Sequence, residues 1–343
     1  MARTKTSGKI ERLKAVLVDK HRMLIVLQDH PDPDALASAT ALRELVRELA
    51  EIPCSMTHRG TVGRAENRAL VQYLDLNLHQ CDRIEFDKFD LVGMVDTQPG
   101  TGNNCLPPEV TPHIVIDHHP CKRLTRSADF HDIRSRCGAT STILLEYLRS
   151  AGITPDVRLA TALLYGIRSD TQDLGREATR ADIEATGSLF PLANPRMLSD
   201  IQRGLVPRSY YRVLVQGLLN ARVYRDATIS GFADIDNADM IGEVADLLLR
   251  DEGISTVMCY GFCQGRLVIS IRLSDSGRKA GTIAKHVVSR RGTGGGHDTY
   301  AGGQIILKEN TPLERTILEE VVRRRFLKAL GLQAHLGVNL LRF

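Results

Sequence analysis

The sequence predicts an α/β protein of two domains: an N-terminal parallel-sheet domain and a smaller C-terminal α/β domain, joined by a helical linker. The chain has 343 residues, which exceeds one average domain of roughly 100–200 residues. Short apolar runs rich in branched residues alternate with segments whose apolar residues recur at helical spacing, a pattern typical of α/β folds. A charged helical segment without a strand pattern separates two such regions.

The N-terminal domain, residues 1–185, is predicted to contain a parallel sheet because its apolar runs are continuous rather than alternating. Residues 23–27, which read Met-Leu-Ile-Val-Leu, form the first run. Ala, Leu, Glu and Arg at helical spacing then predict a helix over residues 35–51. Further strands are predicted at 90–95 and 113–116, and further helices at 139–148 and 157–167.

Residues 186–226 are predicted to form the helical linker, and residues 227–343 the second α/β domain. In that domain we predict strands at 228–235, 257–262, 266–272 and 304–308, and helices at 240–249, 282–288 and 313–330. A glycine-rich loop, residues 292–297, is predicted before the last strand. Because ligand sites often lie between domains, we expect the active site in the cleft between the two.

The composition is that of a globular protein with a mild excess of positive charge. Hydrophobic residues make up 43% and charged residues 25% of the chain, and the formal net charge is +4. An aromatic content of 5% without tryptophan disfavours a stacking platform for single-stranded nucleic acid. No apolar stretch approaches the roughly 20 residues that span a bilayer, and no signal peptide is evident. We therefore expect a cytoplasmic protein without a membrane partner.

Cysteine usage points to the same compartment. The number of cysteines is odd, their spacing is scattered and no Cys-x-x-Cys motif occurs, which argues against a disulfide framework or a zinc ribbon. We expect reduced thiols, as is usual for cytoplasmic proteins. The cysteines are Cys54, Cys81, Cys105, Cys121, Cys137, Cys259 and Cys263.

Acidic and imidazole side chains follow the predicted strands. The first strand is followed by Asp32 and Asp34, the second by Asp96, and the third by the triplet Asp117-His118-His119; Asp170 follows the helix predicted at 157–167. Because ligands of open α/β sheets bind outside the carboxyl ends of the strands, these groups are expected to converge on one crevice.

Such a group of carboxylates calls for a counterion. Crowded like charges raise one another's pKa unless a cation neutralises them. Carboxylates combined with imidazole suit Mn²⁺ better than Mg²⁺, which prefers oxygen ligands and water. Two cations roughly 3.5–4 Å apart form the clamp used in phosphate-ester hydrolysis.

Each part also has a purely structural interpretation. The Asp-Pro-Asp segment is typical of a turn followed by a helix N-cap. Asp96 precedes Thr-Gln-Pro-Gly, which is typical of a turn, and Asp170 is suited to a helix terminus. Two adjacent histidines after an acid are an unusual choice for a plain loop, so the triplet at 117–119 carries more weight.

The order Asp-x-Asp, Asp, Asp-His-His, Asp resembles the DHH phosphoesterase superfamily, which is named after this triplet. Gly294-Gly295-Gly296-His297, followed by Ala-Gly-Gly, resembles the Gly-Gly-Gly-His signature of the DHH-associated C-terminal domain. Ser270-Ile271-Arg272 resembles that domain's Ser-x-Arg strand. The resemblance covers about residues 20–310 and is closest to the branch of bacterial nanoRNases (oligoribonucleases) and pAp phosphatases.

The resemblance implies a role for each matching residue of the N-terminal domain. Asp32 is expected to bind a first metal ion and Asp34 a second, and Asp96 is expected to bridge both. His118 and Asp170 are expected to complete the shell of the second ion. The two remaining triplet residues are expected to act in catalysis: His119 would face the scissile phosphate, and Asp117 would orient an imidazole.

The resemblance also implies the ligands. Two Mn²⁺ ions per chain are expected, with Mg²⁺ as a substitute. The C-terminal domain is expected to bind substrate phosphates through Arg272 and His297 and through the backbone of Gly294, Gly295 and Gly296. The implied substrates are short RNA oligonucleotides, pAp (3′-phosphoadenosine 5′-phosphate) or linear dinucleotides, and a homodimer is left open.

One position departs from the pattern of the relatives. They usually carry a histidine ligand of the first metal four residues before the Asp-x-Asp motif, where this chain has Gln28. Three explanations are open: Gln28 binds through its amide oxygen, His30 replaces the missing ligand, or the first metal site is weakened.

The function predicted from these features is Mn²⁺-dependent hydrolysis of short oligoribonucleotides or pAp-type nucleotides by a hydroxide that two metal ions activate. One alternative is a phosphatase specific for pAp or linear dinucleotides. Another is a nucleotide-binding or sensor protein that has lost turnover, which Gln28 alone supports. A manganese pyrophosphatase shares the N-terminal motifs, but the glycine-rich segment at 294–297 argues against it.

Overall fold

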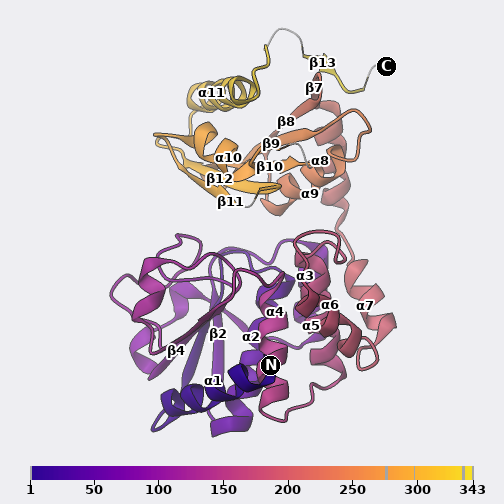
Figure 1. Ribbon diagram of the computed structural model, residues 1–343. Coiled ribbons are helices and arrows are strands. Elements are labelled where there is room, and N and C mark those ends of the chain that lie inside the picture. Colours follow the sequence, from indigo (N-terminus) through magenta and orange to yellow (C-terminus); the bar gives the residue numbers. More distant parts are fainter. Residues whose placement is uncertain (1, 275–276, 297, 334–336, 342–343) are drawn as a thin grey trace. The chain divides into compact units, whose positions relative to one another are not determined.

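The computed structural model describes residues 2–274, 277–296, 298–333 and 337–341. It divides into two compact units, Met1–Leu205 and Val206–Phe343, each built from helices packed on a sheet (Figure 1). The predicted α/β class is confirmed for both parts of the chain. The division lies within the segment 186–226, and helix α8 (Arg208–Leu219) belongs to the second unit.

The first unit contains a parallel sheet with the strand order β3-β2-β1-β4-β5-β6. Its strands are β1 (Met23–Val26), β2 (Cys54–His58), β3 (Leu78–Gln80), β4 (Leu91–Val95), β5 (Ile114–Asp117) and β6 (Phe130–Ile133). Strand β1 has β2 on one side and β4 on the other, so the strand order reverses there. In such sheets, the carboxyl ends of the strands at the reversal form the ligand site.

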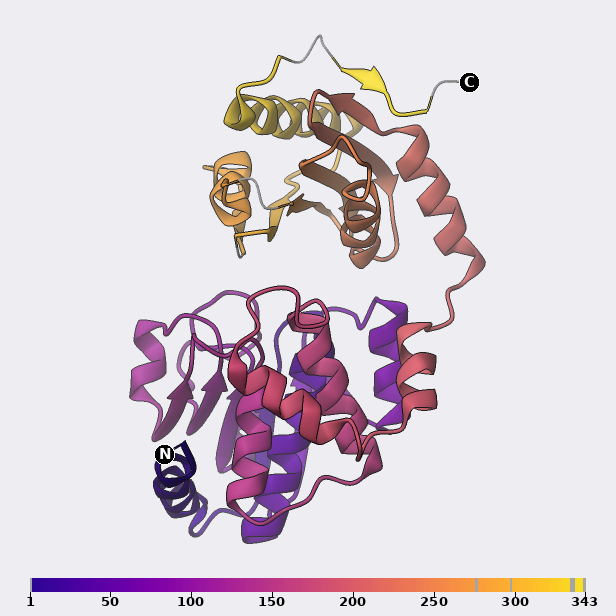
Figure 2. The same cartoon turned by 45° about the vertical axis from the view of Figure 1, so that its right-hand side comes forward.

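Helices cover one face of this sheet, and loops cover the other face (Figure 2). The helices are α1 (Ala2–Leu17), α2 (Pro33–Ala50), α3 (Ala65–Tyr73), α4 (Thr140–Ser150), α5 (Val157–Asp170), α6 (Arg180–Leu189) and α7 (Pro195–Gln202). Short 3-10 helices are η1 (Cys81–Arg83), η2 (Phe86–Lys88) and η3 (Arg123–Ser127). Met23 and Ile25 of β1 pack against the helices, and Leu24 and Val26 pack against the loops. Burial on both faces explains the continuous apolar run.

Several elements of the first unit were not predicted from the sequence. They are α1, α3, β2, β3 and β6. Strand β2 reads Cys-Ser-Met-Thr-His and β6 reads Phe-His-Asp-Ile, so neither contains the apolar run by which we recognised β1. Both strands form because a parallel neighbour supplies the hydrogen bonds, which is a tertiary effect that local propensity does not report.

The second unit contains a mixed sheet with the order β11-β12-β10-β9-β8-β7-β13, in which β8 and β9 run parallel and the other pairs run antiparallel. Its strands are β7 (Arg222–Tyr224), β8 (Ala227–Asp234), β9 (Thr256–Cys263), β10 (Arg266–Leu273), β11 (Thr293–Gly296), β12 (Tyr300–Ile306) and β13 (Val338–Asn339). Helices α10 (Ala280–Val288) and α11 (Pro312–Leu330) pack on one core, and α8 and α9 (Asp239–Leu248) on the other. Among the described residues, no helix combines the length and apolar character needed to cross a membrane.

The glycine-rich segment corrects one prediction. We expected a loop at 292–297 and a strand at 304–308, but Thr293–Gly296 is an edge strand and its partner is Tyr300–Ile306. Glycine is required here by close packing: a Cβ on Gly296, whose φ is +148°, would lie 2.5 Å from the Ala301 Cα. Three consecutive glycines lack the side chains from which a strand is recognised in a sequence.

The cysteines provide a second correction. Cys81 of η1 and Cys105, in the loop after β4, form a disulfide and are therefore not the reduced thiols we expected. Their Cα atoms lie 6.4 Å apart, within the range that a disulfide spans. The pairing depends on the order of the strands and on how the loops on one face of the sheet pack together. The spacing of the cysteines in the sequence does not encode either of these. Cys54, Cys121, Cys137, Cys259 and Cys263 are free thiols.

Candidate metal centre

Asp32 and Asp34 lie at the start of helix α2, after the short loop that follows the central strand β1. The side chain of Asp32 caps the helix, with Oδ1 accepting a hydrogen bond from the Ala35 amide at 2.9 Å. Asp34 is fully buried, and its two oxygens accept hydrogen bonds from the amides of Thr140 at 2.6 Å and Ser141 at 2.8 Å. The positive end of α4 therefore holds the Asp34 carboxylate in place.

Asp96 follows β4 and has a φ of +56°, a left-handed conformation that aspartate tolerates better than most residues. Its Oδ1 accepts a hydrogen bond from the Thr140 hydroxyl at 3.0 Å, and its Oδ2 accepts one from the Gln28 side-chain amide at 3.3 Å. The Asp96 carboxylate is thus fixed from both sides while remaining buried.

His118 lies between two carboxylates. Its Nδ1 is 3.2 Å from the Cys137 carbonyl oxygen, an arrangement that places the proton on Nδ1 and the lone pair on Nε2. Nε2 lies 3.1 Å from Asp170 at the end of α5 and 3.4 Å from Asp96. This nitrogen is buried, and neither contact has hydrogen-bond geometry. Once a cation displaces the proton from Nε2, its lone pair is directed at the same place as these carboxylates, which is the arrangement expected of a metal ligand.

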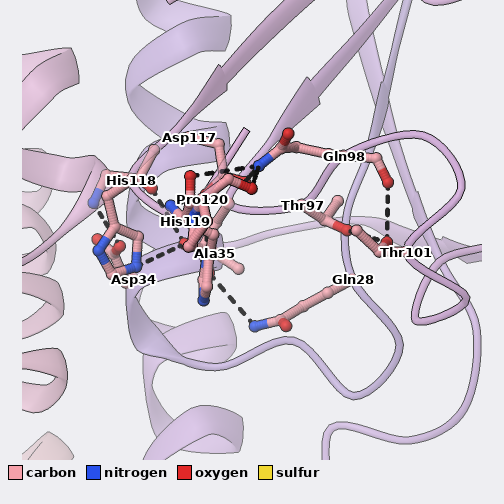
Figure 3. A network of polar contacts seen from close by, with 12 residues as sticks. Gln28, Asp34, Ala35, Thr97, Gln98, Thr101, Asp117, His118, His119 and Pro120 are labelled. Atoms are coloured by element: carbon pink, nitrogen blue, oxygen red, sulfur yellow. Dashed lines mark hydrogen bonds and ion pairs between the residues drawn. The ribbon is translucent and has the colours of Figure 1, made fainter. Parts of the chain in front are cut away.

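His119 is held by Asp117 rather than by the acidic group. Asp117 Oδ1 lies 2.8 Å from His119 Nδ1 and accepts a hydrogen bond from the His119 amide at 3.0 Å. The fully buried amide of Gln98 donates to Asp117 Oδ2 at 2.6 Å, as Figure 3 shows. The Gln98 Oε1 in turn accepts hydrogen bonds from the Lys122 amide and the Thr125 hydroxyl. The orientation of His119 is therefore fixed through a chain of buried contacts.

Four of the predicted ligands form one tight group. Carboxylate oxygens of Asp34, Asp96 and Asp170 and a ring nitrogen of His118 all lie within 4.8 Å of one another. These are the four residues that we expected around the second metal ion. The donor set of three carboxylates and one imidazole, together with the orphaned His118 nitrogen, fits a divalent cation. An overlapping group contains Asp96, Asp117, His118 and His119, but Asp117 and His119 already bind each other.

The electrostatics of this group favour a cation. Burial raises the pKa of Asp34 to about 6, and the charge of Asp170 adds to the effect. Burial likewise raises the pKa of Asp96 well above its usual range, and Asp32 contributes through its charge. For His118, burial lowers the pKa, but the neighbouring Asp170 carboxylate outweighs it and raises the pKa to about 10. Protons therefore balance the negative charge in the metal-free protein, and a divalent cation would replace them.

Two supporting residues were missed from the sequence. Gln98 lies in a segment that resembles a turn, and its contacts to Asp117 depend on the packing of two loops. Asp182 of α6 is fully buried and accepts hydrogen bonds from the Gly138 amide, the Thr142 hydroxyl, and both the amide and hydroxyl of Thr179. It thereby fixes the start of α4, whose amides bind Asp34. The sequence does contain one feature that indicates a structural role for Asp182, namely its capping-box spacing from Thr179.

The second unit holds the remaining predicted site residues. Arg272 on β10 donates to Asp246 from Nε and to the Ser270 hydroxyl from Nη1 at 2.7 Å, and its guanidinium lies 6.0 Å from the Tyr300 ring centre. Gly294, Gly295 and Gly296 form the edge strand β11. His297 lies outside the described residues.

Comparisons with known proteins agree with the residue pattern. Residues 22–167 match the DHH family, N-terminal domain, and residues 223–324 match the DHHA1 domain. The chain is 32% identical over 350 residues to the uncharacterized protein MJ1633 of Methanocaldococcus jannaschii, covering 96% of this chain and 71% of that protein. The chain belongs to the DHH family. Asp34, Asp96 and His118 of the acidic group lie within the residues that match the DHH family, and Asp170 lies just after them.

Solved structures share the fold of this DHH-family chain. An exopolyphosphatase-related protein from Bacteroides fragilis superposes with a TM-score of 0.68 at 14% identity, covering 94% of this chain and 97% of that one. RecJ from Thermus thermophilus, solved in complex with Mn²⁺, superposes with a TM-score of 0.52 at 15% identity. That match covers 93% of this chain and 55% of RecJ. At these identities the likeness concerns the fold alone.

Proposed function

We propose that this DHH-family protein is a Mn²⁺-dependent hydrolase of phosphate esters, acting on short oligoribonucleotides or on pAp-type nucleotides. The observation that carries the proposal is the group formed by Asp34, Asp96, His118 and Asp170. A cation bound there supplies a Lewis acid that lowers the pKa of water and stabilises charge on a phosphoryl oxygen. The precedent of Mn²⁺ bound to RecJ, which shares the fold, supports the choice of metal.

His119 is proposed to act on the phosphate itself. Its side chain is about one third exposed (31%), whereas that of His118 is almost fully buried (8%). Asp117 holds Nδ1 of His119, so the ring presents Nε2 to a substrate. With Nδ1 donating to Asp117, the doubly protonated ring would also donate a hydrogen bond from Nε2 to a phosphoryl oxygen and stabilise the charge that develops in the transition state.

The substrate class rests on the resemblance and on the chemistry of the second unit. Strand β11 offers a stretch of backbone without side chains, to which a phosphate can approach closely. Arg272 lies one strand away from β11 in the sheet, because its strand β10 pairs with β12 and β12 pairs with β11. We propose that these groups bind a phosphate of a short substrate.

A second candidate function is a nucleotide sensor without turnover. It is favoured by the Gln28 side chain, which donates to Asp96 from the position of an expected metal ligand. A phosphatase specific for pAp or linear dinucleotides is a narrower form of the first proposal. We further propose a cytoplasmic location.

The test is Mn²⁺-dependent release of phosphate or mononucleotide from pAp, pGpG, a pentanucleotide RNA, a much longer RNA and pyrophosphate. We expect hydrolysis of the short substrates and sparing of the long RNA. The matched control is Asp96→Asn, because asparagine tolerates the left-handed backbone at this position. It should reduce turnover by at least about 10–100-fold, the loss that is typical even of residues that only support a metal ligand. A silent wild-type protein that still binds pAp would favour the sensor instead.

A further inference from the structure

The side chain of Gln28 is held in a defined place at the end of β1. The loop that follows β4 crosses the chain here, forming an antiparallel backbone bridge between Gln28 and Asn104. The amide of Asp29 donates to the Asn103 carbonyl oxygen. The Asn104 side chain donates to the Thr97 hydroxyl and the Gln98 carbonyl oxygen, both at 2.9 Å, so the crossing loop is tied to the segment that carries Asp96.

From this place the amide nitrogen of Gln28 faces the acidic group, as Figure 3 shows. It donates to Asp96 Oδ2 at 3.3 Å. Donor hydrogens therefore face the Asp96 carboxylate from the position at which a ligand of the first metal ion was expected.

The two oxygens of Asp96 each accept one hydrogen bond, Oδ1 from the Thr140 hydroxyl and Oδ2 from Gln28, but their further surroundings differ. Oδ1 lies 3.4 Å from the lone-pair nitrogen of His118, in the same group as Asp34 and Asp170. Oδ2 faces the N–H groups of Gln28. A cation is attracted to the first side and repelled on the second, because an amide N–H carries the positive end of its dipole.

His30 does not take the place of Gln28 on the second side. His30 has a φ of +56°, and its Nδ1 lies 3.2 Å from the Thr61 amide nitrogen and 3.1 Å from the Thr61 carbonyl oxygen. The ring packs over Gly60, where a Cβ would lie 2.5 Å from its Cε1. The side chain of His30 is thus engaged by the loop after β2 and not by Asp32 or Asp96.

We propose that this protein binds one divalent cation tightly, among Asp34, Asp96, His118 and Asp170, and that the Gln28 carboxamide takes the place of a second cation between Asp32 and Asp96. The inference rests on the metal centre of the proposed function but not on turnover. It replaces the expectation of two Mn²⁺ ions with one strongly bound ion.

The test counts metal ions without any substrate. Metal-stripped full-length protein is titrated with Mn²⁺ by calorimetry, and the ions retained after desalting are measured by elemental analysis. We expect one equivalent for the wild type. Gln28→Glu has the same shape but exchanges donor hydrogens for a ligand oxygen, and Gln28→His supplies an imidazole; each should retain two equivalents. The second ion should bind at least about 10–100-fold more tightly to Gln28→His than to the wild type.

Electron paramagnetic resonance gives an independent readout. The wild type should show the spectrum of isolated Mn²⁺, and both Gln28 variants should show exchange-coupled pairs. Gln202→His, the same change at an exposed helix end of the first unit, should behave as the wild type. Two ions or none in the wild type, or one ion in both Gln28 variants, would overturn the inference. A one-ion protein without hydrolytic activity would refute the proposed function and leave this inference standing.

Discussion

Arg272 shows how much of a side chain's role depends on its immediate partners. It is 15% exposed and is bound by Asp246, whose side chain is 43% exposed, and by the Ser270 hydroxyl. These contacts hold the guanidinium in one orientation, which reduces the entropy that a phosphate must offset when it binds. A positioned arginine is suited to bidentate recognition of phosphate.

Arg272→Ala should therefore weaken binding of short substrates without much effect on the chemical step. We expect KM to rise about tenfold, the value of one hydrogen bond to a charged group, with kcat nearly unchanged. Steady-state kinetics on the pentanucleotide provide the measurement. Arg266→Ala on the same strand is the control, since Arg266 is exposed and binds only Gln304 among the described contacts. An unchanged KM would remove Arg272 from the binding site.

At this scale the sequence predicts residue types well and orientations poorly. The carboxylates of Asp34 and Asp96 could be placed at one edge because parallel strands end together. The direction of the Gln28 amide could not be predicted, since it depends on a loop that arrives from beyond β4. The same holds for Gln98, whose partners follow a different strand.

Among the elements, helix α1 packs on the apolar core through Ile10, Leu13 and Leu17 and is also bound to the sheet by a buried carboxylate. Asp132 on β6 is 4% exposed and accepts hydrogen bonds from Lys9 of α1 at 2.7 Å, from Arg134, and from the Tyr147 hydroxyl of α4 at 2.8 Å. Burial alone would raise the pKa of Asp132, but the hydrogen bonds and charges of Arg134 and Lys9 outweigh it and lower the pKa. One ionised side chain thus joins a strand to two helices.

Asp132→Asn should lower the free energy of unfolding by about 1–3 kcal/mol at neutral pH. Because the pKa is depressed in the folded state, this contribution is complete above the ordinary value of 3.8 and is lost as the pH falls through the native value. Chemical denaturation of both proteins at several pH values gives the difference. Glu85→Gln, which removes an exposed ion pair with Lys88, should change stability by less than about 0.5 kcal/mol. A difference that grows in acid would contradict the assignment.

The elements that could be predicted are those with strong local periodicity. Helices α2 and α5 were placed within a few residues because their apolar spacing and caps agree. Strands β2 and β6 were missed because they are short and half polar, and β11 because it consists of Thr and three glycines. Their existence depends on neighbours in the sheet, which a local pattern does not contain.

At the scale of the whole molecule, the chain has separate apolar cores in its two units. All four residues of the proposed metal site belong to the first unit. A ligand that binds only the folded form of one unit stabilises that unit by mass action.

Mn²⁺ should therefore slow hydrogen exchange in the first unit alone. A free concentration of about 100 times the Kd adds about 3 kcal/mol to local stability. We expect protection of the amides of Thr140 and Ser141, which bind Asp34, and of strand β1. Exchange measured by mass spectrometry on the full chain provides the test, and Asp34→Asn should lose the response. Equal protection of residues 206–343 would show that the metal acts on the whole molecule instead.

The disulfide between Cys81 and Cys105 links the stability of the first unit to the redox conditions around the protein. It closes a covalent loop with a sequence separation of 24, and that loop contains β4 and the metal ligand Asp96. In the chain-entropy description, closing a loop of this length lowers the conformational entropy of the unfolded chain. The free energy of unfolding rises by about 3 kcal/mol as a result. A thiol reductant withdraws that stabilisation from the first unit only. The persistence of the metal centre is thus linked to the thiol–disulfide balance of its surroundings, although no cysteine contributes to the group of ligands.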